Sequence, residues 1–172
     1  ENFKRPKKEF DYLMGLFKKA FQELMTKDKE RLKQIKVQFI GRIKLFPKEI
    51  QKVMQELQEK TKNNKPYTLN FAMAYSGQAE VVDATKRIVE KVENGDLNID
   101  EINEQVFKEN LDLSSEPDLV IRTSEKRLSG FLLFQSAYAE IMFVDKLWPE
   151  FEKEVFVACI NEFSSRKRRF GA

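Results

Sequence analysis

The chain has 172 residues, 41% of them apolar, a size and composition that predict one compact domain with a hydrophobic core. Its 31 basic and 28 acidic residues leave a formal net charge of +3, which excludes a polycation built for nucleic acid. The chain has no histidine and one cysteine, Cys159, so an intrachain disulfide is excluded. Any catalysis would rest on carboxylates, guanidinium groups and a hard cation such as Mg²⁺.

The sequence contains no run of about 18 apolar residues and no apolar signal segment at its N-terminus. These absences predict a cytoplasmic protein that does not span a membrane. A peripheral contact with a bilayer remains open, because surface association needs no spanning segment.

Hydrophobic periodicity predicts helices and strands that alternate along the first half of the chain. In chain order these are a helix from Pro6 to about Gln34, a strand over 35–40, a helix from Pro47 to about Lys62, a strand over 67–75, and a helix that follows Gly77 and stops at Asn94 and Gly95.

The same alternation continues through the second half. The expected elements are a short helix over 99–110, a strand over 118–123, an apolar helix from about Gly130 to Glu140, a strand near 141–144, and a helix from Pro149 to about Arg168. Strands separated by helices predict an α/β fold with a mainly parallel sheet flanked by helices. We assign residues 1–172 to one domain.

A phosphate-binding group of residues follows the strand over 118–123. Its apolar run delivers Arg122 to the C-terminal end of the strand, where open α/β sheets bind ligands. Basic side chains, hydroxyls and the expected helix start then crowd together, at Thr123, Ser124, Lys126, Arg127, Ser129 and Gly130. Such a group suits a diphosphate better than a lone carboxylate. The alternative is that the arginines only solvate a surface turn.

Several motifs resemble the signature of the cis-prenyltransferases, the undecaprenyl and polyprenyl diphosphate synthases. They are DLVIRTS, EKRLSGFLLFQSAYAE and LWPEF in the second half, ENFKRP at residues 1–6, AYSGQAEVVDA at 74–84 and RRFG at 168–171. The motifs occur in the family's order and cover nearly the whole chain. The resemblance implies the fold of that family.

The resemblance also implies roles for residues of the second half. The counterparts of Arg122, Arg127 and Ser129 bind the diphosphate of isopentenyl diphosphate, and Glu125 is a weaker candidate for contacts in the same loop. Glu140 stands where the family has a carboxylate that coordinates Mg²⁺. The alternative for Glu140 is an ordinary solvent-exposed glutamate.

Both ends of the chain carry further implied site residues. Asn2 resembles a residue tied to the reacting centre, Phe3 packs beside the allylic chain, and Arg5 helps to hold the allylic diphosphate. Arg169 and Gly171 match an ending that reaches into the acceptor site of a neighbouring subunit, which implies a homodimer. The basic tail is too short to favour nucleic acid as its partner.

The chain departs from the family in three places. It lacks the aspartate motif that opens family members, so we expect it to be the N-terminally incomplete remainder of a longer protein. A glycine that the family has between Ser124 and Glu125 is missing, which removes a flexible backbone position at the phosphate site. The family's YGGR is replaced by the run from Tyr75 to Gln78.

The expected activity is therefore a Mg²⁺-dependent condensation of isopentenyl diphosphate with an allylic diphosphate, such as farnesyl or geranylgeranyl diphosphate, into a Z-polyprenyl diphosphate. The product is expected to be a precursor of a glycosyl carrier lipid. The alternative is a non-catalytic partner subunit that pairs with a competent chain.

Overall fold

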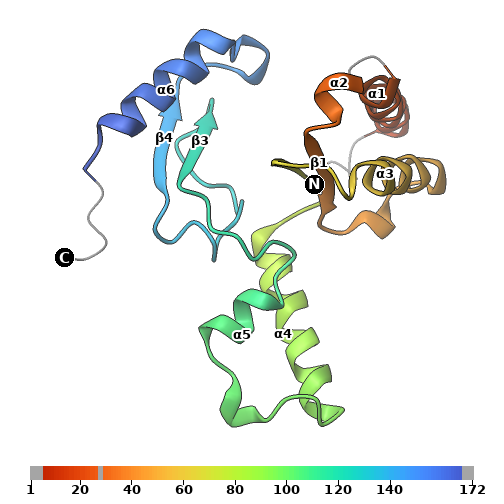
Figure 1. The fold of residues 1–172 in the computed structure, drawn as a ribbon, viewed down its shortest axis with the longest axis vertical. Coiled ribbons are helices and arrows are strands. Elements are labelled where there is room, and N and C mark those ends of the chain that lie inside the picture. The colour runs from red at the N-terminus through yellow and green to blue at the C-terminus, as the bar shows by residue number, and fades with distance from the viewer. Residues whose placement is uncertain (1–5, 27–28, 168–172) are drawn as a thin grey trace. The chain divides into compact units, whose positions relative to one another are not determined.

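The computed structural model describes residues 6–26 and 29–167, and the chain divides into two compact units between Tyr75 and Ser76. Within the described residues each unit contains helices and one pair of parallel strands (Figure 1). The predicted α/β class with parallel strands is thereby confirmed. The assignment of residues 1–172 to a single domain stays a prediction.

The first unit follows the expected order of elements. It consists of α1 (Lys7–Thr26), α2 (Lys29–Leu32), β1 (Ile35–Ile40), α3 (Lys48–Thr61) and β2 (Tyr67–Ala72), with a 3₁₀ turn at Ile43–Leu45. The single helix predicted from Pro6 to Gln34 corresponds to α1 and α2, and residues 27–28 between them lie outside the described residues. The apolar positions that favoured a continuous helix stop at Met25, and the next buried one is Leu32.

The core of the first unit lies between α1, α3 and the strand pair. β1 pairs in parallel with β2 from Ile35 opposite Tyr67 to Ile40 opposite Ala72. Aromatic rings connect α1 to the sheet and the two strands to each other. The ring centroids are 4.9 Å apart for Phe21 of α1 and Phe39 of β1, and 5.4 Å apart for Phe39 and Phe71 of β2. At the surface, Lys18 of α1 donates a 2.6 Å hydrogen bond to Glu49 of α3, and this bond and its charge lower the pKa of Glu49.

The second unit contains the remaining elements. They are α4 (Gly77–Glu93), α5 (Glu104–Glu109), β3 (Leu119–Thr123), β4 (Glu140–Val144) and α6 (Lys153–Ser165), with 3₁₀ turns at Ile99–Glu101 and Trp148–Glu150. β3 pairs in parallel with β4 from Leu119 opposite Glu140 to Thr123 opposite Val144. The strands lie side by side with α6 near them (Figure 1).

The helix predicted from Gly130 to Glu140 was wrong. Between β3 and β4 the chain forms consecutive turns, and backbone angles in the left-handed region at Ser129, Gly130 and Leu132 are incompatible with a regular helix. One helix-like bond remains, from the Ser136 amide to the Leu132 carbonyl at 2.9 Å. Glu140 therefore begins β4 instead of ending a helix.

Candidate functional site

The proposed site begins at β3, the strand that carries Arg122. Val120 of β3 is buried, and the pairing of Arg122 with Phe143 places the arginine near the C-terminal end of β3. The chain then turns sharply: the Ser124 amide donates to the Val144 carbonyl at 3.0 Å, and the Glu125 amide donates to the Thr123 carbonyl at 2.8 Å. These two bonds return the loop toward the end of the strand.

Four of the residues predicted from the sequence come together in this loop. The Arg122 guanidinium donates to the Glu125 carboxylate at 2.7 Å and to the Ser129 hydroxyl at 3.3 Å. Arg127 contacts the same two partners, Glu125 at 2.7 Å and Ser129 at 3.3 Å. Glu125 thus bridges the two arginines and holds their positive charges side by side, a role that its sequence position alone did not show.

The cluster retains hydrogen-bond donors for a ligand. A guanidinium group has five N–H donors, and within the described residues the hydrogen bonds of Arg122 use Nη2. Its Nε is buried and has no hydrogen-bond partner in that part of the chain. Buried polar atoms normally find partners, so an arginine left in this state is consistent with a group that binds an anion.

The missing glycine has a structural consequence at Ser124. This serine takes a φ of 62°, a left-handed conformation that glycine adopts without steric cost and that most L-residues avoid. The shortened loop therefore keeps its sharp bend without a glycine at that position. Lys126 was also predicted to be one of the phosphate-binding residues. Its side chain instead lies 3.5 Å from the Asp145 carboxylate, and both side chains are exposed.

Glu140, the predicted Mg²⁺ ligand, is held by a guanidinium group. Arg166 donates to Glu140 at 2.6 Å and to Glu162 at 2.5 Å. The hydrogen bond to Glu162 is the largest cause, and that to Glu140 the next, of a raised pKa of Arg166. The described residues contain no group of three or more acidic or thiol side chains that could hold a metal. A lone carboxylate still suits Mg²⁺, which is commonly held by one or two carboxylates together with substrate phosphates.

The other predicted site residues lie outside the described residues. They are Asn2, Phe3 and Arg5 at one end and Arg169 and Gly171 at the other. Their assigned roles stay predictions.

Sequence reasoning missed a buried polar pair in the second unit. Glu80 of α4 and Gln135 of the segment between β3 and β4 are 3% and 1% exposed, and they hydrogen-bond to each other. The signal was present in the sequence as a glutamine inside the apolar run FLLFQ. A polar side chain in such a run needs a buried partner.

Parallel strands flanked by helices, with a cluster of guanidinium and hydroxyl groups at the end of β3, place the protein in the α/β class. The family model described as "Putative undecaprenyl diphosphate synthase" matches residues 1–171. The chain therefore belongs to this prenyltransferase family, as its motifs predicted.

Two similar proteins carry the name of an enzyme of that family. The chain is 42% identical over 176 residues to the tritrans,polycis-undecaprenyl-diphosphate synthase (geranylgeranyl-diphosphate specific) of Methanocaldococcus jannaschii, covering 99% of this chain and 63% of that protein. The enzyme of the same name from Pyrococcus horikoshii is 45% identical over 174 residues, at 99% and 66% coverage. The chain thus spans slightly less than two thirds of these relatives.

Solved structures show the same fold. A probable undecaprenyl diphosphate synthase from Campylobacter jejuni superposes with a TM-score of 0.86 at 35% identity, covering 99% of this chain and 78% of that one. Lavandulyl diphosphate synthase from Lavandula x intermedia, in complex with dimethylallyl diphosphate, gives a TM-score of 0.90 at 32% identity, with 99% and 74% covered.

Proposed function

We propose that the protein is a cis-prenyltransferase that condenses isopentenyl diphosphate with an allylic diphosphate to form a Z-polyprenyl diphosphate. The observation that carries this proposal is the convergence of Arg122, Arg127 and Ser129 at the end of β3, in a chain of the prenyltransferase family. Two planar guanidinium forks can bind the oxygens of a diphosphate in several bidentate ways. The cluster would bind and orient the diphosphate of the isopentenyl substrate.

Glu125 gives the diphosphate site its shape before a ligand arrives. Its carboxylate accepts a 2.7 Å hydrogen bond from each guanidinium group, so both arginines lie at the site before the substrate binds. Preorganisation of this kind reduces the entropy that binding costs. A bound diphosphate would take up donors of both arginines that Glu125 does not use.

We assign geranylgeranyl diphosphate as the preferred allylic substrate, because the archaeal relatives named above carry that specificity in their names. Asn2, Phe3 and Arg5 are the residues proposed to meet this substrate. The product would be a polyprenyl diphosphate that serves as precursor of a glycosyl carrier lipid. No helix among the described residues is long and apolar enough to cross a membrane. Release of the product is proposed to involve a peripheral contact with a bilayer.

Mg²⁺ is the proposed metal, with Glu140 as its protein ligand. When bound, the ion would neutralise diphosphate charge as the allylic bond breaks. Before Glu140 can bind a cation with its paired oxygen, the Arg166 guanidinium must release that oxygen.

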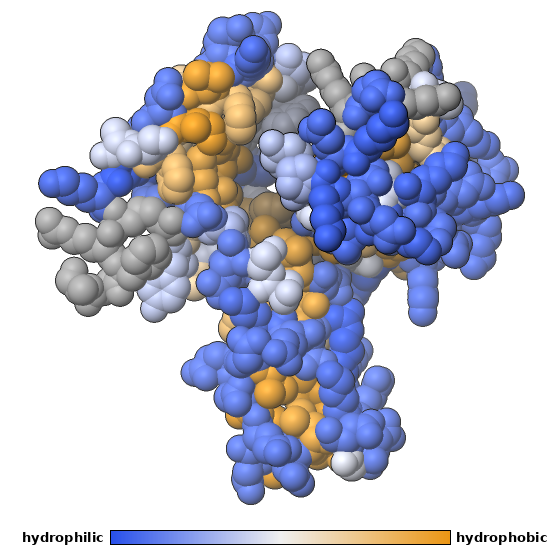
Figure 2. Space-filling model, in the orientation of Figure 1, coloured by the Kyte–Doolittle hydropathy of each residue, from blue (hydrophilic) through white to orange (hydrophobic). Residues whose placement is uncertain are grey.

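A homodimer is the proposed assembly. The surface of α6 presents apolar side chains, with Phe156, Val157 and Ile160 all more than a third exposed, and Phe143 of β4 is exposed as well. Figure 2 shows apolar side chains gathered over the part of the second unit that contains these elements. Such patches commonly mark protein interfaces, and Arg169 and Gly171 would complete the acceptor site of the neighbouring subunit.

A condensation assay on the full-length protein tests the function. Labelled isopentenyl diphosphate is supplied with geranylgeranyl or farnesyl diphosphate, with and without a chelator, and the products are sized by chromatography. We expect long polyprenyl products that need Mg²⁺, and more of them with the geranylgeranyl primer. An Arg122→Gln variant should lower kcat/KM for isopentenyl diphosphate by about 100-fold, since it loses charged hydrogen bonds to the substrate.

The matched control is Lys146→Gln, which removes one positive charge at an exposed position after β4. It should leave kcat/KM within about 2-fold, because an exposed charge contributes little. Absence of product with both primers would contradict the proposal. Product that appears only when a second, different chain is added would establish the partner-subunit alternative.

A further inference from the structure

We propose that Glu80 is a positioning residue: together with Gly77 and Gln135 it fixes the segment over 129–136, and so sets where Ser129 stands in the diphosphate site. The inference rests on the proposed function of that site.

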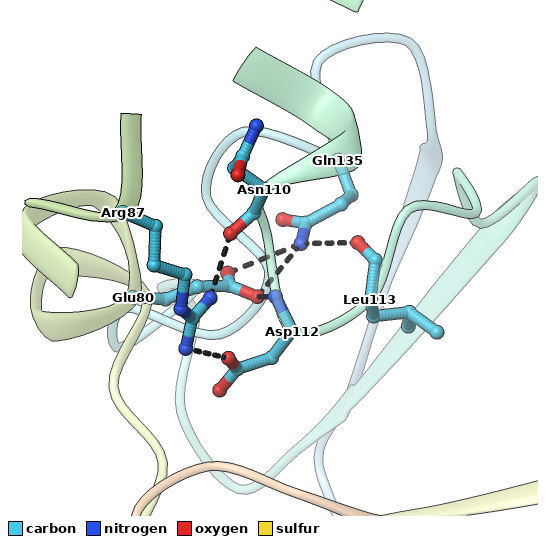
Figure 3. Close-up of polar contacts among 6 residues, drawn as sticks. All are labelled: Glu80, Arg87, Asn110, Asp112, Leu113 and Gln135. Atoms are coloured by element: carbon cyan, nitrogen blue, oxygen red, sulfur yellow. Dashed lines mark hydrogen bonds and ion pairs between the residues drawn. The ribbon is translucent and has the colours of Figure 1, made fainter. Parts of the chain in front are cut away.

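The contact between Glu80 and Gln135 is buried and uses both carboxylate oxygens. The Gln135 side-chain amide donates to Glu80 Oε1 at 3.2 Å and to Oε2 at 3.1 Å, and also to the Leu113 carbonyl at 2.9 Å (Figure 3). The Asp112 amide donates to Glu80 Oε1 at 3.0 Å. One carboxylate on α4 thereby joins the segment between the two strands to the segment that enters β3.

Arg87, two turns further along α4, strengthens the second of these connections. Its guanidinium donates to the Asn110 carbonyl at 2.6 Å and to the Asp112 carboxylate at 2.7 Å (Figure 3). The chain over 110–113 is therefore hydrogen-bonded to α4 at two positions, Glu80 and Arg87. Because that chain leads into β3, α4 is the common support for the strand that bears Arg122 and for the segment that bears Ser129.

A second contact holds the other end of the segment. The Gly77 amide donates to the Gly130 carbonyl at 2.6 Å. A Cβ atom at position 77 would lie 2.6 Å from that carbonyl oxygen and 2.8 Å from Leu133 Cγ, closer than real contacts allow. The first turn of α4 thus approaches the segment at Gly130 and again at Gln135.

The segment needs such support because it is not a helix. Its left-handed residues Ser129, Gly130 and Leu132 interrupt the regular backbone bonds, and the side-chain oxygens of Gln135 and Ser136 are buried without hydrogen-bond partners within the described residues. A structure that leaves these atoms unsatisfied beside a buried carboxylate gives up stability. Left-handed residues and unsatisfied buried polar atoms are expected where a protein keeps a functional geometry at a cost in stability.

Ser129 is the link from this support to the ligand. It precedes Gly130 directly, and its hydroxyl accepts from both Arg122 and Arg127 at 3.3 Å. A shift of the segment would move the hydroxyl away from both guanidinium groups. The structure therefore predicts that loss of the Glu80 contact weakens binding of the isopentenyl substrate and leaves the allylic substrate unaffected.

The test compares Glu80→Gln and Gln135→Met with wild type in the full-length protein. Glu80→Gln keeps the size of the side chain and removes one acceptor of the Gln135 amide, and Gln135→Met removes that donor while keeping an unbranched chain. We expect each variant to raise KM for isopentenyl diphosphate by about 10-fold or more, with KM for the allylic diphosphate within about 2-fold. Glu90→Gln, at an exposed position of the same helix, is the control and should change neither constant.

Thermal unfolding and direct binding of isopentenyl diphosphate by calorimetry complete the design. A lower Tm with both KM values unchanged, or with both raised alike, would show a purely structural pair and overturn the inference. If wild type makes polyprenyl products but both variants keep its KM for isopentenyl diphosphate, only the inference fails. If wild type neither binds isopentenyl diphosphate nor forms products, the proposed function fails and the inference with it.

Discussion

The left-handed conformation of Ser124 predicts an unusual substitution that stabilises the protein. In this region a non-glycine residue destabilises the folded state by about 1–2 kcal/mol through steric strain. Glycine destabilises it by about 0.5–1 kcal/mol, because it loses more chain entropy on folding. Ser124 is exposed, so its side chain contributes little packing. Ser124→Gly should therefore raise the free energy of unfolding by about 0.5 kcal/mol, measured by urea denaturation.

Leu132 provides the matched comparison, since its φ of 45° is also left-handed but its side chain is only 6% exposed. Leu132→Gly should lower the free energy of unfolding by about 2 kcal/mol or more, because the loss of buried surface exceeds the relief of strain. Opposite signs at two positions of the same backbone class would separate strain from packing. A Ser124→Gly variant that is clearly less stable than wild type would show that the bend carries no strain.

Individual site residues were predictable from the sequence where neighbouring residue types by themselves indicate a binding site. Arg122, Arg127 and Ser129 were found because a basic and hydroxyl-rich run follows an apolar strand, and the structure brings them together. Glu80 was not found, because its partner lies 55 positions away and a helix-start glutamate is otherwise ordinary. Contacts of such separation depend on the tertiary fold, which periodicity along one chain does not specify.

At the scale of elements, a single hydroxyl joins α3 to β1. Thr61 is fully buried, accepts a hydrogen bond from the Val37 amide at 3.0 Å and donates one to the Leu57 carbonyl at 2.8 Å. Thr61→Val keeps the shape and removes both bonds, leaving the Val37 amide buried without its acceptor. We expect a loss of about 1–3 kcal/mol in urea denaturation, with faster hydrogen exchange at the Val37 amide.

Thr85 of α4 is the control for this prediction, because its hydroxyl makes the same bond to the carbonyl four residues earlier, at 2.8 Å, but is exposed. Thr85→Val should change the free energy of unfolding by no more than about 0.5 kcal/mol. Equal losses at the two positions would mean that the bond within the helix, and not the link to the strand, sets the cost.

Elements with a clear hydrophobic period in the sequence were predicted with nearly correct bounds. The strand over 35–40 has the predicted bounds, and α3 differs from its prediction by one residue at each end, because alternation and a preceding proline mark their limits. The predicted helix from Gly130 was wrong because FLLFQSAYA contains good helix formers and no breaker. Tertiary contacts from Gly77 and Glu80 of α4 override that local preference.

At the scale of the whole molecule, the sequence indicated the class of fold and the family more readily than the assembly. The motifs occur in the family's order over nearly the full chain, and the family model matches residues 1–171. Subunit contacts carry no comparable pattern, because an apolar residue on α6 reads the same whether it meets the protein's own core or another subunit. The dimer must therefore be tested through exposed side chains.

Ile160 on α6 is the position for that test, since it is 38% exposed and lies on the same helix face as Phe156 and Val157. Ile160→Asp places a charge in the proposed interface, where it would be buried without a partner, so we expect the dimer to dissociate. Light scattering coupled to size-exclusion chromatography should give twice the subunit mass for wild type and the subunit mass for this variant. Asn161→Asp adds the same charge at the next, exposed position and should remain dimeric. A wild-type protein that elutes at the subunit mass, or an Ile160→Asp variant that stays dimeric, would place the interface elsewhere or remove it.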